Sequence, residues 1–157
     1  MENIDTHLEI VREELPSDVA DLGLEAQAEG YRLIDTLMRE WADGTNRYDG
    51  TEEILMTVRR NDRLVGIGGV TVDPVVTSAL RMRRFYIGKA FRRHGLGRRL
   101  ASALIESVVP QGKPIFVNAG TKVAPAFWEA IGFRRHVEAG HTHVLGDFAR
   151  MPDADQL

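Results

Sequence analysis

Apolar and polar positions follow two different spacings along the chain, and the spacing changes repeatedly from one segment to the next. Short segments that alternate between apolar and polar residues, or that are apolar throughout and bounded by Pro or Gly, predict β-strands. Apolar residues that recur three or four positions apart predict helices. The predicted strands cover residues 8–11, 53–59, 64–72, 79–87, 114–118, 133–137 and 143–148, and the predicted helices cover residues 19–26, 33–41, 95–108 and 123–131.

The order of these elements, β-α-α-β-β-β-α-β-α-β-β, indicates the fold class. A regular βαβ repeat would alternate strands and helices throughout, whereas here strands also follow one another directly. The pattern favours an α/β fold in which helices flank one mixed sheet. The chain has 157 residues, 43% of them hydrophobic and 27% charged, which suits a single domain spanning residues 1–157.

Composition excludes several kinds of chemistry. The chain contains no cysteine, so disulfides, thiolate zinc sites and a cysteine nucleophile are all excluded. The N-terminal residues 1–14 are acidic and lack the apolar core of a signal peptide, and no apolar run is long enough to cross a membrane. We therefore expect a cytoplasmic protein that makes no membrane contact.

The net charge of −3 hides a strong asymmetry between the two parts of the chain. Residues 1–62 carry 16 acids and 6 bases, a net charge of −10, whereas residues 63–157 carry 7 acids and 14 bases, a net charge of +7. Arginine and lysine are dense between residues 81 and 99. Such a stretch is typical of a polyanion site, for nucleic acid or a phosphorylated cofactor, and also of a solvated surface.

One segment joins a predicted strand to a predicted helix through a turn with two glycines. Residues 85–100 read Phe-Tyr-Ile-Gly-Lys-Ala-Phe-Arg-Arg-His-Gly-Leu-Gly-Arg-Arg-Leu. The first N–H groups of a helix have no partner inside the helix, and the helix dipole places partial positive charge there. Because Gly95 and Gly97 lack a Cβ, the backbone can approach an anion closely. The segment therefore predicts a cradle for a pyrophosphate.

Two common phosphate motifs do not fit this segment. A Walker loop ends in Gly-Lys-Ser/Thr, which is absent here. A dinucleotide fingerprint needs Gly or Ala three residues after Gly97, where this chain has Leu100, and it opens the first βαβ unit rather than lying past mid-chain.

The turn instead resembles the signature of the GCN5-related N-acetyltransferase (GNAT) family. Arg92-Arg93-His94-Gly95-Leu96-Gly97 matches the family's Gln/Arg-x-x-Gly-x-Gly/Ala pattern. A second stretch, residues 124–133, reads Ala-Pro-Ala-Phe-Trp-Glu-Ala-Ile-Gly-Phe and matches its Ala-x-x-Phe-aromatic-x-x-x-Gly-Phe helix. The two motifs stand in the family's order, and the predicted elements agree along nearly the whole chain. The resemblance implies an acyl-CoA N-acyltransferase fold with a splayed central pair of strands.

The resemblance also implies acetyl-CoA as cosubstrate and assigns residues to it. The pyrophosphate would lie on residues 93–98, and the pantetheine arm would pair with the fourth strand near Phe85 and Ile87. The backbone N–H of Ile87 would polarise the thioester carbonyl. Asn118 either contacts the arm or bonds its own turn. The cofactor-binding residues implied are Phe85, Ile87, Arg92, Arg93, His94, Gly95, Leu96, Gly97, Arg98, Asn118 and Trp128.

The chain departs from the family in its acid and base groups. Residues 79–86 contain no glutamate to serve as base, so Glu52, Glu53 and Asp73 are candidates and we expect a relay through water. Many members carry a tyrosine, which protonates the leaving thiolate, where this chain has Trp128. An indole N–H donates a hydrogen bond but is not a proton source. Tyr86, His94 and solvent are the alternative acids.

The acceptor is expected to be a primary amine of a small molecule or peptide. The acidic first part of the chain would attract a cationic amine, whereas Arg81 and Arg83 would bind a carboxylate of the acceptor or pair with nearby acids. A non-catalytic CoA-binding sensor is the alternative function. Nucleic-acid binding ranks last because exposed aromatic residues do not interleave with the arginines.

Two further expectations concern metals and assembly. His141 and His143 alternate on a predicted hairpin and would share a face, with His136 on its other strand. No nearby acid at ligand spacing completes a site, so we expect no metal. A homodimer is possible through the sheet edge that the final hairpin leaves.

Overall fold

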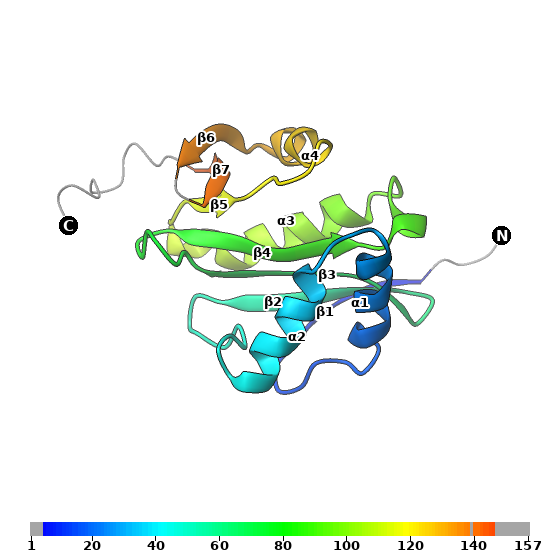
Figure 1. Cartoon of the computed structure of the whole chain (residues 1–157). Coiled ribbons are helices and arrows are strands. Elements are labelled where there is room, and N and C mark those ends of the chain that lie inside the picture. Colours follow the sequence, from blue (N-terminus) through cyan, green and yellow to red (C-terminus); the bar gives the residue numbers. More distant parts are fainter. Residues whose placement is uncertain (1–4, 139, 147–157) are drawn as a thin grey trace.

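A mixed β-sheet runs through the molecule and separates helices on its two faces (Figure 1). The computed structural model describes residues 5–138 and 140–146. In this part of the chain the sheet has seven strands in the order β1-β2-β3-β4-β5-β7-β6. The strands are β1 Thr6–Ile10, β2 Ile54–Arg60, β3 Arg63–Val72, β4 Leu80–Ile87, β5 Ile115–Val117, β6 Arg134–Glu138 and β7 His141–Leu145. The helices are α1 Val19–Ala28, α2 Leu33–Asp43, α3 Leu96–Val108 and α4 Ala124–Ile131, with short 3-10 turns η1 Lys89–Phe91 and η2 Val109–Gln111.

The predicted α/β class and element order are confirmed. Most predicted boundaries agree within one or two residues. The largest differences lie in the last strand, where β7 begins at His141 and ends at Leu145. Residues 147 and 148 of the predicted strand lie outside the described residues.

Two large hydrophobic cores form, one on each face of the sheet, besides a small cluster of Ala79, Phe116 and Val144. The face that packs against α3 and α4 buries Leu80, Met82, Leu100, Leu104 and Trp128. The opposite face packs against α1 and α2 and buries a second group, which includes Leu22, Ile34, Leu37, Ile67 and Tyr86. Each amphipathic helix thus removes one apolar face from water, which is the main favourable term in forming these layers.

A β-bulge interrupts β4 and changes which side chains face each core. Gly69 pairs with Arg83 and Ile67 pairs with Tyr86, so two residues of β4 lie opposite Gly68 alone. Arg84 in the bulge has a positive φ of 51°. The extra residue shifts the alternation of β4 by one position. The β4 side chains that face α3 and α4 therefore have even numbers before the bulge, such as Met82, and odd numbers after it, such as Ile87.

The central strands β4 and β5 pair over a short distance only. They run parallel and are in register at Leu80 with Ile115 and at Arg81 with Phe116. Since β4 continues to Ile87, its second half has no pairing with β5 in the described chain. The splayed pair expected from the sequence is present.

The two edges of the sheet are β1 and β6. Four of the five positions of β6 are exposed, so this strand is an open edge.

No helix in the described part of the chain combines the length and hydropathy of a bilayer-crossing segment.

Candidate active site

The turn between β4 and α3 contains residues in the left-handed backbone conformation, which glycine adopts most readily. Arg93 and Gly95 have positive φ values of 65° and 77°, and Gly95 is the residue immediately before α3. A Cβ built on Gly95 would meet no atom within 4 Å. The conformation favours glycine at this position, and open space lies beside the start of the helix.

Gly97 is packed closely against neighbouring side chains. A Cβ built there would lie 3.2 Å from Cε1 of Phe127 and 3.5 Å from Cγ1 of Ile87. The absent side chain therefore lets α3 pack closely against α4 and β4, which is a reason for glycine here besides the predicted approach to an anion. Leu96 between the two glycines is buried and anchors the first turn of the helix.

The charged residues of the turn divide into engaged and available groups. The guanidinium of Arg92 donates to both carboxylate oxygens of Glu29, at 2.8 and 2.6 Å, and its Nε donates to the Ile87 carbonyl at 2.9 Å. Arg93, His94 and Arg98 are exposed, and within the described chain they form no ion pair. The positive charge available to an anion in this structure thus comes from Arg93 and Arg98 rather than from Arg92.

A groove of about 770 Å³ lies beside this turn. It is lined by residues of β1, by Gly95, and by the outward-facing residues of α3 that include Arg98 and Arg99. A basic groove that begins at a helix N-terminus suits a phosphorylated ligand.

The backbone of β4 offers a donor next to the turn. The N–H of Gly88 donates to the Val65 carbonyl of β3 at 2.8 Å. Successive N–H groups of a strand point to opposite sides, so the N–H of Ile87 points away from β3, toward the side where β4 and β5 no longer pair. An added strand or an extended ligand can bond there.

The match of the sequence to a family model shows to which family the chain belongs. Residues 27–144, well over half of the chain, match the acetyltransferase (GNAT) domain. The chain belongs to the GNAT family.

Solved structures share the GNAT fold at low sequence identity. A protein of Exiguobacterium sp. 255-15 described as a putative acetyltransferase has a TM-score of 0.82 at 18% identity, over 90% of this chain and 93% of that chain. The GNAT family N-acetyltransferase YhbS of Escherichia coli, solved in complex with CoA, has a TM-score of 0.64 at 14% identity, over 92% and 82%. The ribosomal-protein-S18-alanine N-acetyltransferase of Escherichia coli has a TM-score of 0.63 at 14% identity, over 89% of both chains. No curated protein sequence matches the chain.

Tyr86, one of the candidate acids of this GNAT domain, is engaged by a carboxylate. Its hydroxyl donates to Oε1 of Glu29 at 2.5 Å, and its ring lies in the core beneath α1 and α2. Burial raises the pKa of Tyr86, and the hydrogen bond to Glu29 raises this pKa further. A phenol held in this way is a poor proton donor, so the structure argues against the acid role considered for Tyr86.

Trp128 and Asn118 lie in contrasting environments. Trp128 is buried among three aromatic rings, with centroid distances of 4.9 Å to Phe85, 4.9 Å to Phe127 and 5.2 Å to Phe133. Asn118 follows β5 and is exposed. Its side chain makes no hydrogen bond to the rest of the described chain, so the alternative in which it bonds its own turn is not observed.

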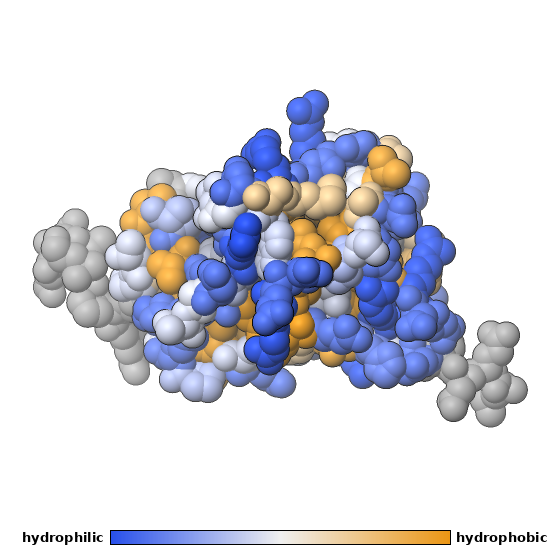
Figure 2. Space-filling model, turned by 90° about the horizontal axis from the view of Figure 1, so that it is seen from below, coloured by the Kyte–Doolittle hydropathy of each residue, from blue (hydrophilic) through white to orange (hydrophobic). Residues whose placement is uncertain are grey.

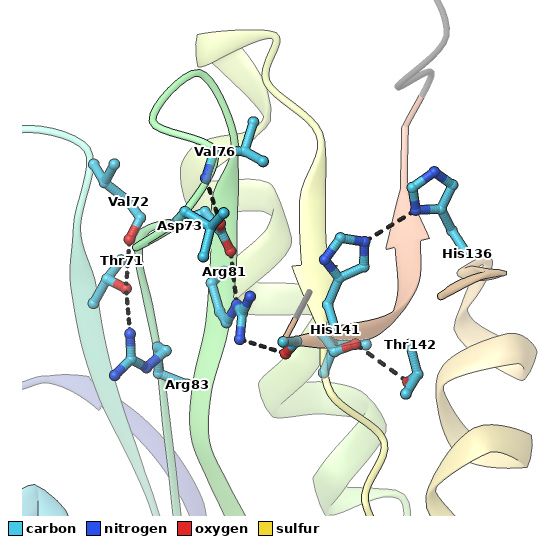
Figure 3. Close-up of polar contacts among 12 residues, drawn as sticks. Thr71, Val72, Asp73, Val76, Arg81, Arg83, His136, His141 and Thr142 are labelled. Carbon is cyan, nitrogen blue, oxygen red and sulfur yellow. Dashed lines mark hydrogen bonds and ion pairs between the residues drawn. The ribbon is translucent and has the colours of Figure 1, made fainter. Parts of the chain in front are cut away.

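The three acids considered as bases all have other partners. Both oxygens of Glu52 bind Lys113 at 2.6 Å. Glu53 accepts from the backbone N–H groups of Gly50 and Val72. Asp73 is buried and accepts from the backbone of residues 75 and 76 and from Nε of Arg81 at 2.7 Å (Figure 3). These contacts favour structural roles, most clearly for Asp73.

An open cleft of about 540 Å³ lies between the loop after α2 and the sheet. Its charged lining residues are Glu40, Arg47, Asp49, Glu53 and Arg83. The face that carries α1 and α2 is hydrophilic over most of its area, with apolar side chains visible between the polar ones (Figure 2). This cleft is the candidate acceptor site.

Arg81 and Arg83, which the sequence treats alike, have different roles. Arg81 pairs with Asp73 and donates to the Gly140 carbonyl at 2.6 Å, so it ties β4 to the turn between β6 and β7 (Figure 3). Arg83 lines the cleft. Only Arg83 is thus placed to contact an acceptor.

The histidines form a cluster that differs from the predicted one. Nδ1 of His136 lies 3.0 Å from Nε2 of His141, and Nε2 of His136 lies 3.9 Å from Oε1 of Glu138. One potential ligand atom from each of these residues lies within 4.8 Å of the others. The expectation that no acid lies near the histidines was therefore wrong. His143 binds Glu129 of α4 instead, at 2.8 Å.

Sequence reasoning missed Glu29, the residue that holds both Arg92 and Tyr86. It lies 63 and 57 positions from these partners, and no local pattern marks it among the many acids of the first half. The cleft was missed for a similar reason, because its lining comes from α2, the following loop, β3 and β4.

Proposed function

We propose that this protein is an N-acetyltransferase that moves an acetyl group from acetyl-CoA to a primary amine of a small molecule or peptide, by direct attack in a ternary complex. One arrangement carries the proposal. The open left-handed turn at Gly95 stands at the start of α3, and the N–H of Ile87 points to the unpaired side of β4. A GNAT domain with this arrangement has the donors that a pyrophosphate and an extended arm require.

The residues present fit the cosubstrate. The N–H groups of residues 93–98 would hold the pyrophosphate, with Arg93 and Arg98 adding charge. Phe85, Ile87, Asn118 and Trp128 would border the arm. When bound, acetyl-CoA supplies an activated acetyl group. The Ile87 N–H would polarise the carbonyl of that group, because a fixed donor in a water-poor site stabilises developing negative charge.

The acceptor amine must lose a proton before it attacks. An alkyl amine has a pKa of about 10.4, so most of it is protonated at neutral pH. Since Glu52, Glu53 and Asp73 are engaged by other groups, we propose that the proton leaves through water in the cleft.

The second candidate is a CoA-binding sensor without turnover. Trp128 stands where many family members carry the acidic tyrosine, and the hydroxyl of Tyr86 is held by Glu29. Release of free thiol from acetyl-CoA in the presence of an amine panel separates the two functions, because only the transferase releases thiol in proportion to acceptor.

Calorimetric titration with acetyl-CoA tests the proposal directly. The chain offers a matched pair of glycines at the two ends of the α3 region: Gly95 and Gly112 have φ values of 77° and 68°, and a Cβ on either meets no atom within 4 Å. Gly95→Trp and Gly112→Trp should therefore strain the backbone similarly. We expect binding to the unaltered protein and to Gly112→Trp, and no binding to Gly95→Trp. A folded protein that binds neither acetyl-CoA, CoA nor longer acyl-CoAs would falsify both candidate functions.

A further inference from the structure

Arg83 is a partly buried arginine that has no acidic partner in the described part of the chain. Three other partly buried arginines pair with a carboxylate, Arg59 with Asp18, Arg81 with Asp73 and Arg84 with Glu40, and the exposed Arg92 pairs with Glu29. Arg60 is also partly buried and, like Arg83, forms no ion pair in the described chain. Arg83 forms no ion pair within residues 5–138 and 140–146. Within the described residues, the side-chain hydrogen bond of Arg83 is a long one, 3.5 Å from its guanidinium to Oγ1 of Thr71 (Figure 3).

This arrangement leaves a positive charge uncompensated. Burial lowers the pKa of Arg83, and the neighbouring guanidinium of Arg84 lowers it further. A partly buried charge without a partner costs free energy, which an incoming anion would recover. The unused donors of the guanidinium form a planar fork that matches a carboxylate.

A second unsatisfied donor lies in the same region. The hydroxyl of Tyr48 is buried and has no hydrogen-bond partner in the described chain. Burial raises the pKa of Tyr48 to about 12, while the nearby charges of Arg84 and Arg83 act in the opposite direction. Positive charge and donor capacity therefore exceed negative charge and acceptor capacity around Arg83.

The position of Arg83 relates the cleft to the reacting group. Arg83 lies on β4 two residues before Phe85 and four before Ile87. At about 3.3 Å per residue, this places its backbone roughly 7 to 13 Å from the proposed acyl site. Its side chain borders the cleft of about 540 Å³ on the side of β4 that faces α2. An acceptor that bonds Arg83 can reach the open side of β4 if it is a small molecule.

The other charges of the cleft select the kind of anion. Glu40 is neutralised by Arg84 at 3.0 Å. The charged residues that remain in the lining are the acids Asp49 and Glu53 and the bases Arg47 and Arg83. A zwitterion with one carboxylate and one ammonium matches this balance, whereas a dianionic phosphate would meet two acids with only two bases to oppose them.

We infer that the acceptor is a small amine that carries a carboxylate, such as an amino acid, and that Arg83 binds this carboxylate. The inference rests on the proposed function and names its substrate class. Arg83 acts as a specificity residue: it anchors the acceptor by its carboxylate, while Asp49 and Glu53 attract the ammonium group before it loses its proton.

Matched pairs of acceptors test the inference. Each pair consists of an amino acid and the amine that lacks only its carboxylate, for example phenylalanine and 2-phenylethylamine. Binding is measured by calorimetry, with the protein both free and saturated with CoA, and transfer is measured as thiol release from acetyl-CoA. We expect at least one amino acid to bind at least 10-fold more tightly than its paired amine and to be the better acceptor.

Variants at the cleft assign this preference to one residue. Arg83→Gln should raise the KM for the amino acid roughly 10- to 100-fold, the effect of losing a charge-assisted hydrogen bond. Arg83→Lys keeps the charge without the planar fork, and its effect should be intermediate. Arg39→Gln is the matched control, since Arg39 is exposed on α2, carries the same charge and does not line the cleft. It should keep the preference of the unaltered protein. Thermal melting establishes that each variant is folded.

The outcomes separate this inference from the proposed function. The inference is overturned if no amino acid in the panel binds, if the paired amines bind equally well, or if folded Arg83→Gln keeps the preference. If acetyl-CoA binds and amines without a carboxylate are acetylated equally well, the proposed function stands and only the substrate class fails. If acetyl-CoA does not bind, the proposed function fails, and titration of the free protein still decides whether Arg83 binds carboxylates.

Discussion

Arg92 and Glu29 form a two-bond ion pair, at 2.8 and 2.6 Å, that joins the glycine turn to the residue that follows α1. The same carboxylate accepts a hydrogen bond from the hydroxyl of Tyr86, and Nε of Arg92 donates to the Ile87 carbonyl. A single acid from the first half of the chain thus fixes the end of β4 and the entry to the turn. The arginine that begins the family signature therefore acts here as a positioning group.

Replacing Glu29 should make this contribution measurable through its pH dependence. Arg92 holds the pKa of Glu29 below its usual value, so the ion pair stabilises the fold at neutral pH and this stabilisation is lost as the pH falls below about 4.3. Glu29→Gln should cost about 1 kcal/mol at pH 7, a value that allows for the partial exposure of Arg92. Urea unfolding across pH 3 to 7 measures the difference.

Glu13→Gln is the control for this experiment, because Glu13 is exposed and has no partner in the described chain. Its stability should follow that of the unaltered protein at every pH. If Glu29→Gln lowers the free energy of unfolding by the same amount at pH 7 and at pH 3, the ion pair is not the source of the stabilisation. An uncharged Glu29 would then stabilise the fold as well as a charged one.

Tyr86→Phe should separate a positioning role from an acid role. Loss of the hydrogen bond to Glu29 should lower stability by about 1 kcal/mol. Since the phenol is already bonded to a carboxylate, we expect kcat for acetyl transfer to change by less than about threefold, whereas loss of a general acid costs about 100-fold or more. Steady-state kinetics over pH 6 to 10 distinguishes the two, and a fall of that size with loss of the alkaline limb would restore Tyr86 as the acid.

The fold was predictable from the sequence because its signals are local. Apolar spacing located the strands and helices, and Asn61 and Asp62 both adopt the positive φ that a tight turn between β2 and β3 requires. The glycine turn was equally predictable, since the conformation of Gly95 depends on few neighbours. In each of these cases adjacent residues determine the outcome.

The pairing of distant side chains was not predictable in this way. Arg81 and Arg83 alternate on one strand, and only tertiary contacts assign a buried partner, Asp73, to the first and, among the described residues, no acid to the second. The histidine cluster depends on a register shift between β6 and β7, after Arg135, that brings His136 beside His141. Strict alternation along the hairpin cannot indicate such an irregularity.

Trp128 should be important mainly for stability. Its ring packs at 4.9 Å from both Phe85 and Phe127, on the side of β4 that faces α4. Trp128→Ala should lower the free energy of unfolding by about 3 to 5 kcal/mol, the usual cost of removing a large aromatic ring from a core. Trp128→Phe should retain most of the stability because it refills much of the space. If urea denaturation gives equal losses for the two variants, the aromatic packing is not what Trp128 contributes.

Asp73→Asn provides the sharpest test of whether this acid is a base or a structural anchor. Asp73 is buried, its side chain is 0% exposed, and it pairs with Arg81, whose side chain is 12% exposed. Removing the negative charge leaves the Arg81 guanidinium buried without its counterion, so we expect a loss of about 3 to 5 kcal/mol. Asp73→Asn combined with Arg81→Met removes both charges and should regain part of that loss, because the buried positive charge is gone. A general base would behave differently: the single variant would stay stable, its kcat would fall steeply, and the double variant would not recover it. Thermal unfolding and kcat measured on the same three proteins, the unaltered chain included, decide between these roles.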